Sequence, residues 1–121
     1  MTFMETLNTQ LQAIKKHDLD MFKTTLHENE DIVCIEPDGK YIKSYTTFIE
    51  NHISWFNDKT WDIDFEVLDI YETIEISIAT TKFKLTENDG VYYMILTLVF
   101  KKTDGKWGLV HDQNTPIKND K

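Results

Sequence analysis

Apolar residues change their spacing at Thr60, from a helical repeat to alternation with polar residues. After this point, Trp61, Ile63 and Phe65 are separated by single acidic residues, which is the pattern of a strand with one buried face. Before Thr60, apolar residues recur at intervals of three and four, as in helices that pack on one side. Helices first and long strands last predict an α+β domain in which the helices cover one face of a sheet.

Three helices are expected in the first half of the chain, each beginning after a residue that can cap it. Thr2, Asp18 and Ser44 are these caps, and Glu5 completes a capping box with Thr2. The apolar stripes are Phe3, Leu7, Leu11 and Ile14; then Leu19, Phe22 and Leu26; then Tyr45, Phe48, Ile49, His52, Ile53 and Phe56.

Two short strands, at 32–35 and 41–43, are expected on either side of the turn Pro37-Asp38-Gly39. Four long strands follow, with turns at Asn88-Asp89-Gly90 and Asp104-Gly105 between the later ones. In the first long strand the apolar alternation slips at Val67-Leu68, which predicts a β-bulge there.

This bulge bears on a possible catalytic carboxylate. Asp69 would point inward on a regular strand, but the bulge favours solvent for its side chain. A similar slip separates Ile74, Ile76 and Ile78 from Phe83 and Leu85 in the second long strand. Bulges of this kind would curl the sheet strongly around the helices.

The final strand-like run, 105–116, has a mixed face that is typical of a cavity wall. Alternation places Trp107, Leu109, His111, Gln113 and Thr115 on one side, and Gly108, Val110, Asp112 and Asn114 on the other. The first face changes from large apolar groups to three hydrogen-bonding groups, which suits a pocket that is dry at one end and polar at the other. His111 and Asp112 lie on opposite faces, so no dyad between these neighbours is expected.

Length and charge exclude several classes of protein. A chain of 121 residues is expected to form one domain, 1–121, with a frayed tail at 118–121. The net charge of −8 argues against nucleic-acid binding. No apolar run approaches the length of a membrane span, and the N-terminus lacks an export signal. The single cysteine, Cys34, excludes an internal disulfide and fits the cytoplasm.

Metal and cofactor sites are not expected. The four histidines show neither an i, i+4 pair nor a His-x-His motif, and Cys34 has no partner cysteine. The four glycines are scattered and form no phosphate-binding or dinucleotide motif.

The chain resembles the nuclear transport factor 2-like superfamily, and within it the SnoaL-like group. The resemblance runs from about Leu7 to Thr115 and rests on the order of elements, on Pro37-Asp38-Gly39 and on Asp104-Gly105-Lys106-Trp107. The last strand of that group often reads Trp-x-Ile/Val-x-His-x-His-x-Ser, whereas here Gln113 replaces the second His and Thr115 the Ser.

This resemblance implies the cystatin-like α+β cone, in which three N-terminal helices pack in the concave face of a strongly curved, mostly antiparallel sheet. It also implies a cavity between the sheet and the first and third helices, and common dimerisation. It does not select one activity, because the superfamily includes isomerases, dehydratases, cyclases, hydrolases and association domains. The strand 91–100 is apolar on both faces, so we expect a homodimer that covers its outer face.

Six residues are candidates for ligand binding, and His111 is also the candidate catalytic residue. They are His111, Gln113, His52, Trp55, Trp107 and Tyr41. For His111 the alternatives are a general acid/base or ligand donor, and a core histidine satisfied by a backbone carbonyl or Gln113. His52 either faces the same cavity or is structural, and the aromatic residues either line the pocket or pack in the core.

Three functions therefore stay open. The first is a cytoplasmic homodimer that binds a small, largely apolar molecule with one polar group. The second is a ketosteroid isomerase-like or dehydratase-like enzyme that uses His111 for proton transfer. The third is a non-catalytic association module. An inward carboxylate beside the ligand would favour the enzyme, a filled cavity would favour the association module, and an open cavity without an acid would favour the binder.

Overall fold

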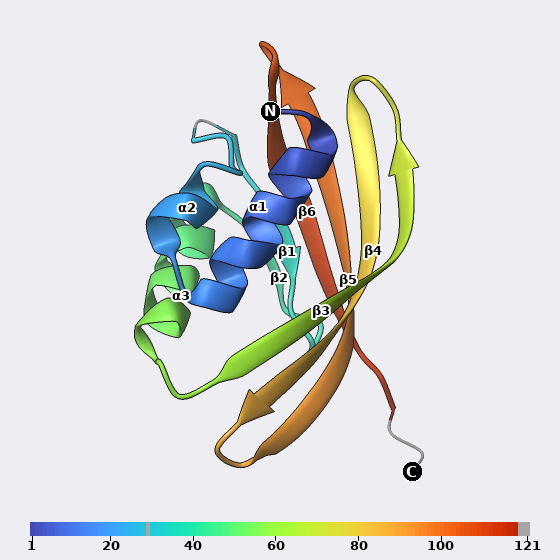
Figure 1. Ribbon diagram of the computed structural model, residues 1–121. Helices are drawn as coiled ribbons and strands as arrows, with labels where there is room; N and C mark the ends of the chain where they lie inside the picture. Colours follow the sequence, from blue (N-terminus) through green and yellow to red (C-terminus); the bar gives the residue numbers. More distant parts are fainter. Residues whose placement is uncertain (29, 119–121) are drawn as a thin grey trace.

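The computed structural model describes residues 1–28 and 30–118. Two helices and two short strands come first, and a third helix and four long strands follow (Figure 1). The elements are α1 (Phe3–Lys16), α2 (Leu19–Lys23), β1 (Val33–Ile35), β2 (Tyr41–Lys43), α3 (Tyr45–Asn57), β3 (Asp62–Glu72), β4 (Ile76–Glu87), β5 (Gly90–Thr103) and β6 (Lys106–Pro116). Of the predicted tail, only Lys118 lies within the described residues.

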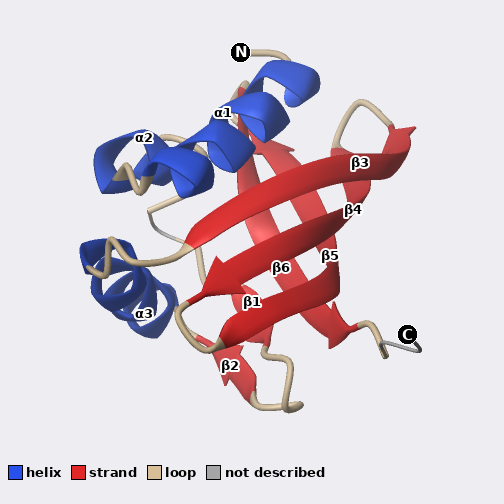
Figure 2. Ribbon diagram, turned by 60° about the horizontal axis from the view of Figure 1, so that its bottom comes forward, coloured by secondary structure: helices blue, strands red, loops and turns tan. Residues whose placement is uncertain are grey.

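The six strands form one sheet in the order β2-β1-β6-β5-β4-β3. All neighbouring strands are antiparallel except β1 and β6, which are parallel. Figure 2 shows the sheet curving around one side, on which all three helices lie. The predicted α+β cone is therefore confirmed.

The helices begin at the predicted caps. Thr2 and Glu5 form the reciprocal capping box of α1, while the side chains of Asp18 and Ser44 accept hydrogen bonds from the first turns of α2 and α3. The second helix ends at Lys23, before the predicted Leu26. Leu26 lies beyond the end of the helix, where it forms an isolated parallel bridge with Leu109. Its side chain is fully buried, as the apolar stripe predicted, although it is not helical.

Aromatic side chains from α1, β5 and β6 make the centre of the core. The Phe3 ring contacts the rings of Phe100 and Trp107 edge to face, at centroid separations of 5.5 and 5.6 Å. Phe3 and Phe100 are almost completely buried, and Trp107 is 6% exposed. This packing holds α1 against the middle of the sheet.

One of the two predicted bulges is present. Val67 pairs with Thr81 and Asp69 with Thr80, which leaves Leu68 as the extra residue, and Asp69 is exposed as expected. The slip predicted in the next strand is wrong, because β4 keeps its register against both neighbours. Small side chains occupy the inner face of β4 before Phe83 and Leu85, and the apolar pattern did not reveal them as buried. They are Ser77, Ala79 and Thr81.

A second bulge, which was not predicted, lies in β6. Val99 pairs with His111 and Phe100 with Leu109, so Val110 is the extra residue. Residues before the bulge keep the predicted orientation, whereas every later residue changes face. Asp112 is consequently buried and Gln113 exposed, the reverse of the prediction.

Candidate functional site

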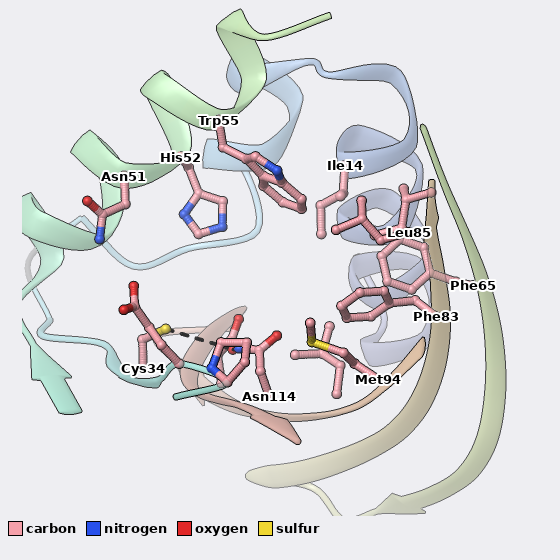
Figure 3. A pocket seen from close by; sticks show the side chains of 15 residues that line it. Ile14, Cys34, Asn51, His52, Trp55, Phe65, Phe83, Leu85, Met94 and Asn114 are labelled. Carbon is pink, nitrogen blue, oxygen red and sulfur yellow. Dashed lines mark hydrogen bonds between the residues drawn. The ribbon is translucent and has the colours of Figure 1, made fainter. Parts of the chain in front are cut away.

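A pocket with a volume of about 340 Å³ lies between α3, the β1–β2 turn and the inner face of the sheet (Figure 3). Its lining residues are Ile14, Cys34, Glu36, Pro37, Asn51, His52, Trp55, Ile63, Phe65, Phe83, Leu85, Met94, Leu96, Asp112 and Asn114. Asn51 and Pro37 are exposed, so the pocket opens to solvent between α3 and the turn that precedes β2. Most of its wall is apolar, and the polar groups lie toward β1, β6 and α3.

The polar end is built on the parallel pair β1 and β6. Cys34 pairs with Asp112 in this register, and both side chains face the pocket. Asn114 Nδ2 donates to Asp112 Oδ1 at 2.8 Å and to the backbone oxygen of Ile35 at 3.2 Å. The Cys34 thiol makes a longer contact with Asp112 Oδ1, at 3.9 Å. Asp112 Oδ2 has no hydrogen-bond partner among the described residues.

Burial controls the protonation of this group. Loss of hydration raises the pKa of Asp112 to about 7, against the smaller opposing effects of the hydrogen bonds from Asn114 and Cys34. The pKa of the Cys34 thiol is raised to about 12, by burial first and by the neighbouring carboxyl of Asp112 second. Near neutral pH the pocket therefore contains an inert thiol and a carboxyl group that exists in both protonation states.

His52 enters the pocket from α3, and its ring points toward the interior in Figure 3. Nδ1 lies 2.9 Å from the backbone oxygen of Phe48, which can only accept, so Nδ1 carries the hydrogen. Burial lowers the pKa of His52 to about 4, although this hydrogen bond acts in the other direction. The ring is thus neutral at physiological pH, and Nε2 is a hydrogen-bond acceptor.

Trp55 is fixed by aromatic stacking. Its ring stacks on Trp61 at 4.1 Å, and the Trp61 ring stacks in turn on His17 at 3.8 Å. The Trp61 indole N–H also donates to the backbone oxygen of Trp55 at 2.8 Å. On the opposite wall, Phe65 and Phe83 meet edge to face at 5.7 Å.

The structure brings two of the six predicted site residues to the pocket, His52 and Trp55. His111 and Gln113 are turned to the outer face of the sheet by the bulge at Val110, so the expectation that His111 faces the cavity is wrong. Trp107 packs in the core against Phe3, and Tyr41 is 57% exposed on β2; neither lines the pocket.

Asp112 and Asn114 take the places that were expected for His111 and Gln113. Their spacing puts two polar side chains on one face of the strand, which is the only sequence signal for them. The signal could be read only with the bulge known, because both faces of the strand are polar after Val110.

Two features are absent from the described residues. None of the helices in 1–28 and 30–118 has the length and apolar character needed to cross a membrane. Within the same ranges, no group of three or more histidine, cysteine or acidic side chains is arranged to hold a metal ion.

We expect Asp112→Asn to stabilise the protein relative to wild type by an amount that grows between about pH 4 and pH 7. Stabilisation by the protonated Asp112 carboxyl is complete below the unfolded-state pKa and is lost as the pH rises through about 7, at up to about 1.4 kcal/mol per pH unit. The lowered pKa of His52 makes its own contribution to stability rise with pH, opposite to that of Asp112. Wild type and variant must therefore be compared at each pH, so that the contribution of His52 cancels.

Urea unfolding of both proteins from pH 4 to pH 8 measures this difference. Asp69→Asn is the control, because it removes an exposed carboxylate outside the pocket and should give a nearly constant difference. A constant difference for Asp112→Asn as well would contradict the raised pKa.

Comparisons with known proteins agree with this architecture. Residues 4–116 match the family described as the SnoaL-like domain. Among curated proteins, no sequence is significantly similar to the chain.

Three solved structures illustrate the likeness in fold. An NTF-2 like protein of unknown function from Shewanella oneidensis MR-1 is 19% identical with a TM-score of 0.78, over 93% of this chain and 94% of that one. A ketosteroid isomerase-like protein from Erwinia carotovora atroseptica is 13% identical with a TM-score of 0.77, over 96% and 94%. A domain of unknown function with a cystatin-like fold from Nostoc punctiforme is 14% identical with a TM-score of 0.72, over 95% and 75%.

At these identities the solved structures show a shared fold and no shared activity. The match to the family covers residues 4–116, which include all three helices and all six strands of the sheet. The chain therefore belongs to the SnoaL-like domain family.

Proposed function

We propose that the protein binds a small, largely apolar molecule with one polar group in the pocket beneath α3. Asp112, Asn114 and His52 would contact the polar group, while Trp55 and the apolar wall would contact the remainder. The observation that carries this proposal is the buried carboxyl group of Asp112, whose Oδ2 lacks a hydrogen-bond partner among the described residues. Among the described residues, the fully buried side-chain polar atoms that lack a partner are Gln10 Oε1 and His17 Nδ1, so Asp112 Oδ2 is open to the pocket. A bound ligand would supply the partner that this poorly hydrated oxygen lacks.

The size of the pocket supports the same proposal. About 340 Å³ lies within the range of small-molecule sites. An association module with a vestigial cavity would be expected to fill this space with its own side chains, as Trp107 does in the neighbouring core. The open pocket thus favours a ligand over pure association.

We expect Met94→Trp to abolish or strongly weaken ligand binding, because the larger side chain would occupy part of the pocket. A thermal-shift screen of small apolar alcohols, ketones, amines and carboxylic acids provides the ligands, and calorimetry measures their affinities. Tyr41→Ala is the matched control, since Tyr41 is exposed and outside the lining. Equal binding by both variants, or no hit among the four classes, would overturn the proposal.

The second candidate is an enzyme that transfers a proton. It is favoured by the pKa of Asp112, which at about 7 suits a general acid or base at neutral pH. Asp112 takes the role first considered for His111. The candidate is less well supported, because removal of a proton next to a carbonyl also needs a donor to the enolate oxygen. Asp112 can fill only one of these roles, and His52 Nε2 carries no hydrogen.

Deuterium exchange tests this second candidate. If Asp112 removes a proton, apolar ketones that bind should gain deuterium next to the carbonyl in heavy water, and Asp112→Asn should slow this exchange by about 100-fold or more. Exchange that is equal in both proteins would exclude Asp112 as the base. The ketosteroid isomerase-like relative supports the ketone class by fold alone.

A homodimer through the outer face of the sheet is part of the proposal. Alternation directs a group of partly exposed apolar side chains away from the helices: Ile76, Ile78, Tyr93, Ile95 and Val99. His111 lies on the same face, between Val33 and Val99 in register. A second copy would cover this apolar surface, as in two-fold symmetric assemblies generally.

A cytoplasmic location likewise remains a proposal, based on the single cysteine.

We expect Ile95→Lys to convert the dimer to a monomer, because it would place a charge in the centre of the buried interface. Ile53→Lys introduces the same change on α3, where Ile53 is 38% exposed on the helical side, and should leave the dimer intact. Sedimentation velocity distinguishes the two. A monomeric wild type, or dissociation by both variants alike, would contradict this interface.

A further inference from the structure

We propose that the polar group of the ligand is a protonated amine, so that the pocket selects apolar amines over alcohols and carboxylic acids. This inference rests on the proposed function, because it specifies the chemistry of the molecule that the pocket binds. It follows from the charges, the hydrogen-bonding groups and the aromatic surfaces that line the pocket.

The charged groups of the pocket have one sign. Asp112 and Glu36 are both part of the lining, whereas no lysine among the described residues is. All 13 basic residues of the chain are lysines, so the sequence has no arginine to clamp a carboxylate. A carboxylate ligand would bring a further negative charge beside Asp112 in a poorly hydrated site, while an ammonium group would be attracted.

The free hydrogen-bonding groups at the polar end are acceptors. Both hydrogens of Asn114 Nδ2 are taken by Ile35 and Asp112, and the Cys34 thiol also contacts Asp112. The hydrogen of His52 lies on Nδ1 and is taken by the backbone oxygen of Phe48.

What remains for a ligand at this end is Asp112 Oδ2, the side-chain oxygen of Asn114 and Nε2 of His52. An ammonium group has three hydrogens and no acceptor, which complements this set. A ketone or carboxylate would need donors. At pH 8, where Asp112 is mostly ionised, the side-chain donors left in the lining are Asn51, which is exposed, and the indole N–H of Trp55.

Aromatic surfaces add to this preference. Trp55, Phe65 and Phe83 are part of the lining, and Figure 3 shows Trp55 on the α3 side with Phe65 and Phe83 toward the sheet. Aromatic faces attract cations, most strongly where water is excluded. The same rings would pack on the apolar body of the ligand.

The amine would compete with a proton for Asp112. Asp112 is protonated in part at neutral pH, because burial raises its pKa to about 7. The other titratable side chains facing it are Cys34 from β1, Glu36 from the following turn and His52 from α3. Cys34 stays protonated and His52 stays neutral between pH 5 and pH 8, since their pKa values are about 12 and about 4. Amine binding should therefore strengthen as the pH rises and Asp112 ionises.

Three probes that share one apolar body test the inference: adamantylamine, adamantanol and adamantane carboxylate. At pH 8 we expect the amine to bind about 10-fold tighter than the alcohol and about 100-fold tighter than the carboxylate, as measured by calorimetry. Asp112→Asn should weaken the amine about 10-fold or more and leave the alcohol within about 3-fold. Between pH 5 and pH 8, wild-type affinity for the amine should rise by about 10-fold or more.

Asp69→Asn is the control for the overall negative charge, which attracts any cation weakly. It makes the same substitution at an exposed carboxylate outside the pocket and should leave amine affinity unchanged. If Asp112→Asn does not fold, the pH dependence of wild-type binding decides the matter in its place.

The outcomes separate this inference from the proposed function. Alcohol and amine bound equally in the pocket, with competition between them, would overturn amine selection and leave the small-molecule pocket intact. Equal loss of amine binding in Asp112→Asn and Asp69→Asn would also overturn it, since surface charge would then explain the preference. Failure of all three probes to bind would overturn the amine inference and count against the proposed function as well.

Discussion

The extra residue in β6 determines what the pocket contains. Up to Leu109 the strand presents large apolar groups to the helices, and the bulge at Val110 then exchanges its two faces. Asp112 and Asn114 turn inward as a result, while His111 and Gln113 turn outward. The strand lies between β5 and β1, so its inward groups are at the centre of the sheet rather than at an edge. Because of the bulge at Val110, the pocket contains the carboxyl group of Asp112 rather than the imidazole of His111.

Burial of Asp112 is unfavourable for its charged form, and the surrounding structure reduces this cost without removing it. Asn114 and Cys34 both contact Oδ1, which leaves the second oxygen for another partner. Buried carboxyl groups that serve only stability usually have all their oxygens paired. A half-satisfied carboxyl next to an open pocket is more typical of a group that acts on something outside the protein chain.

Regularity of pattern decided which features could be predicted from sequence. The helices were predictable because Thr2, Asp18 and Ser44 are strong caps before periodic apolar stripes. The bulge at Leu68 was predictable because apolar residues change parity around it. In β4, Ser77 and Thr81 are buried polar residues that continue the inner face, so the pattern suggested a slip that does not occur.

In β6 a real bulge was missed, because the residues on both faces are polar after Val110 and give no change of apolar parity. The parallel pairing of β1 with β6, which brings Cys34 to Asp112, depends on contacts between distant segments and has no local signal. The pocket as a feature of the fold was therefore predictable, together with His52 and Trp55 on its α3 side. The chemical identity of its polar end was not.

The stack of His17, Trp61 and Trp55 has a consequence for the thermodynamics of recognition. These rings join the end of α1, the start of β3 and the last turn of α3, and the Trp61 N–H bond to the Trp55 backbone ties the helix end to the sheet. Trp55 is thereby held in one rotamer before any guest arrives. Ordering of side chains is one of the main entropic costs of association. For Trp55 this entropy is already lost when the protein folds, so ligand binding does not have to order the ring. The indole wall behaves as a preorganised surface, so guests should be distinguished by shape as well as by charge.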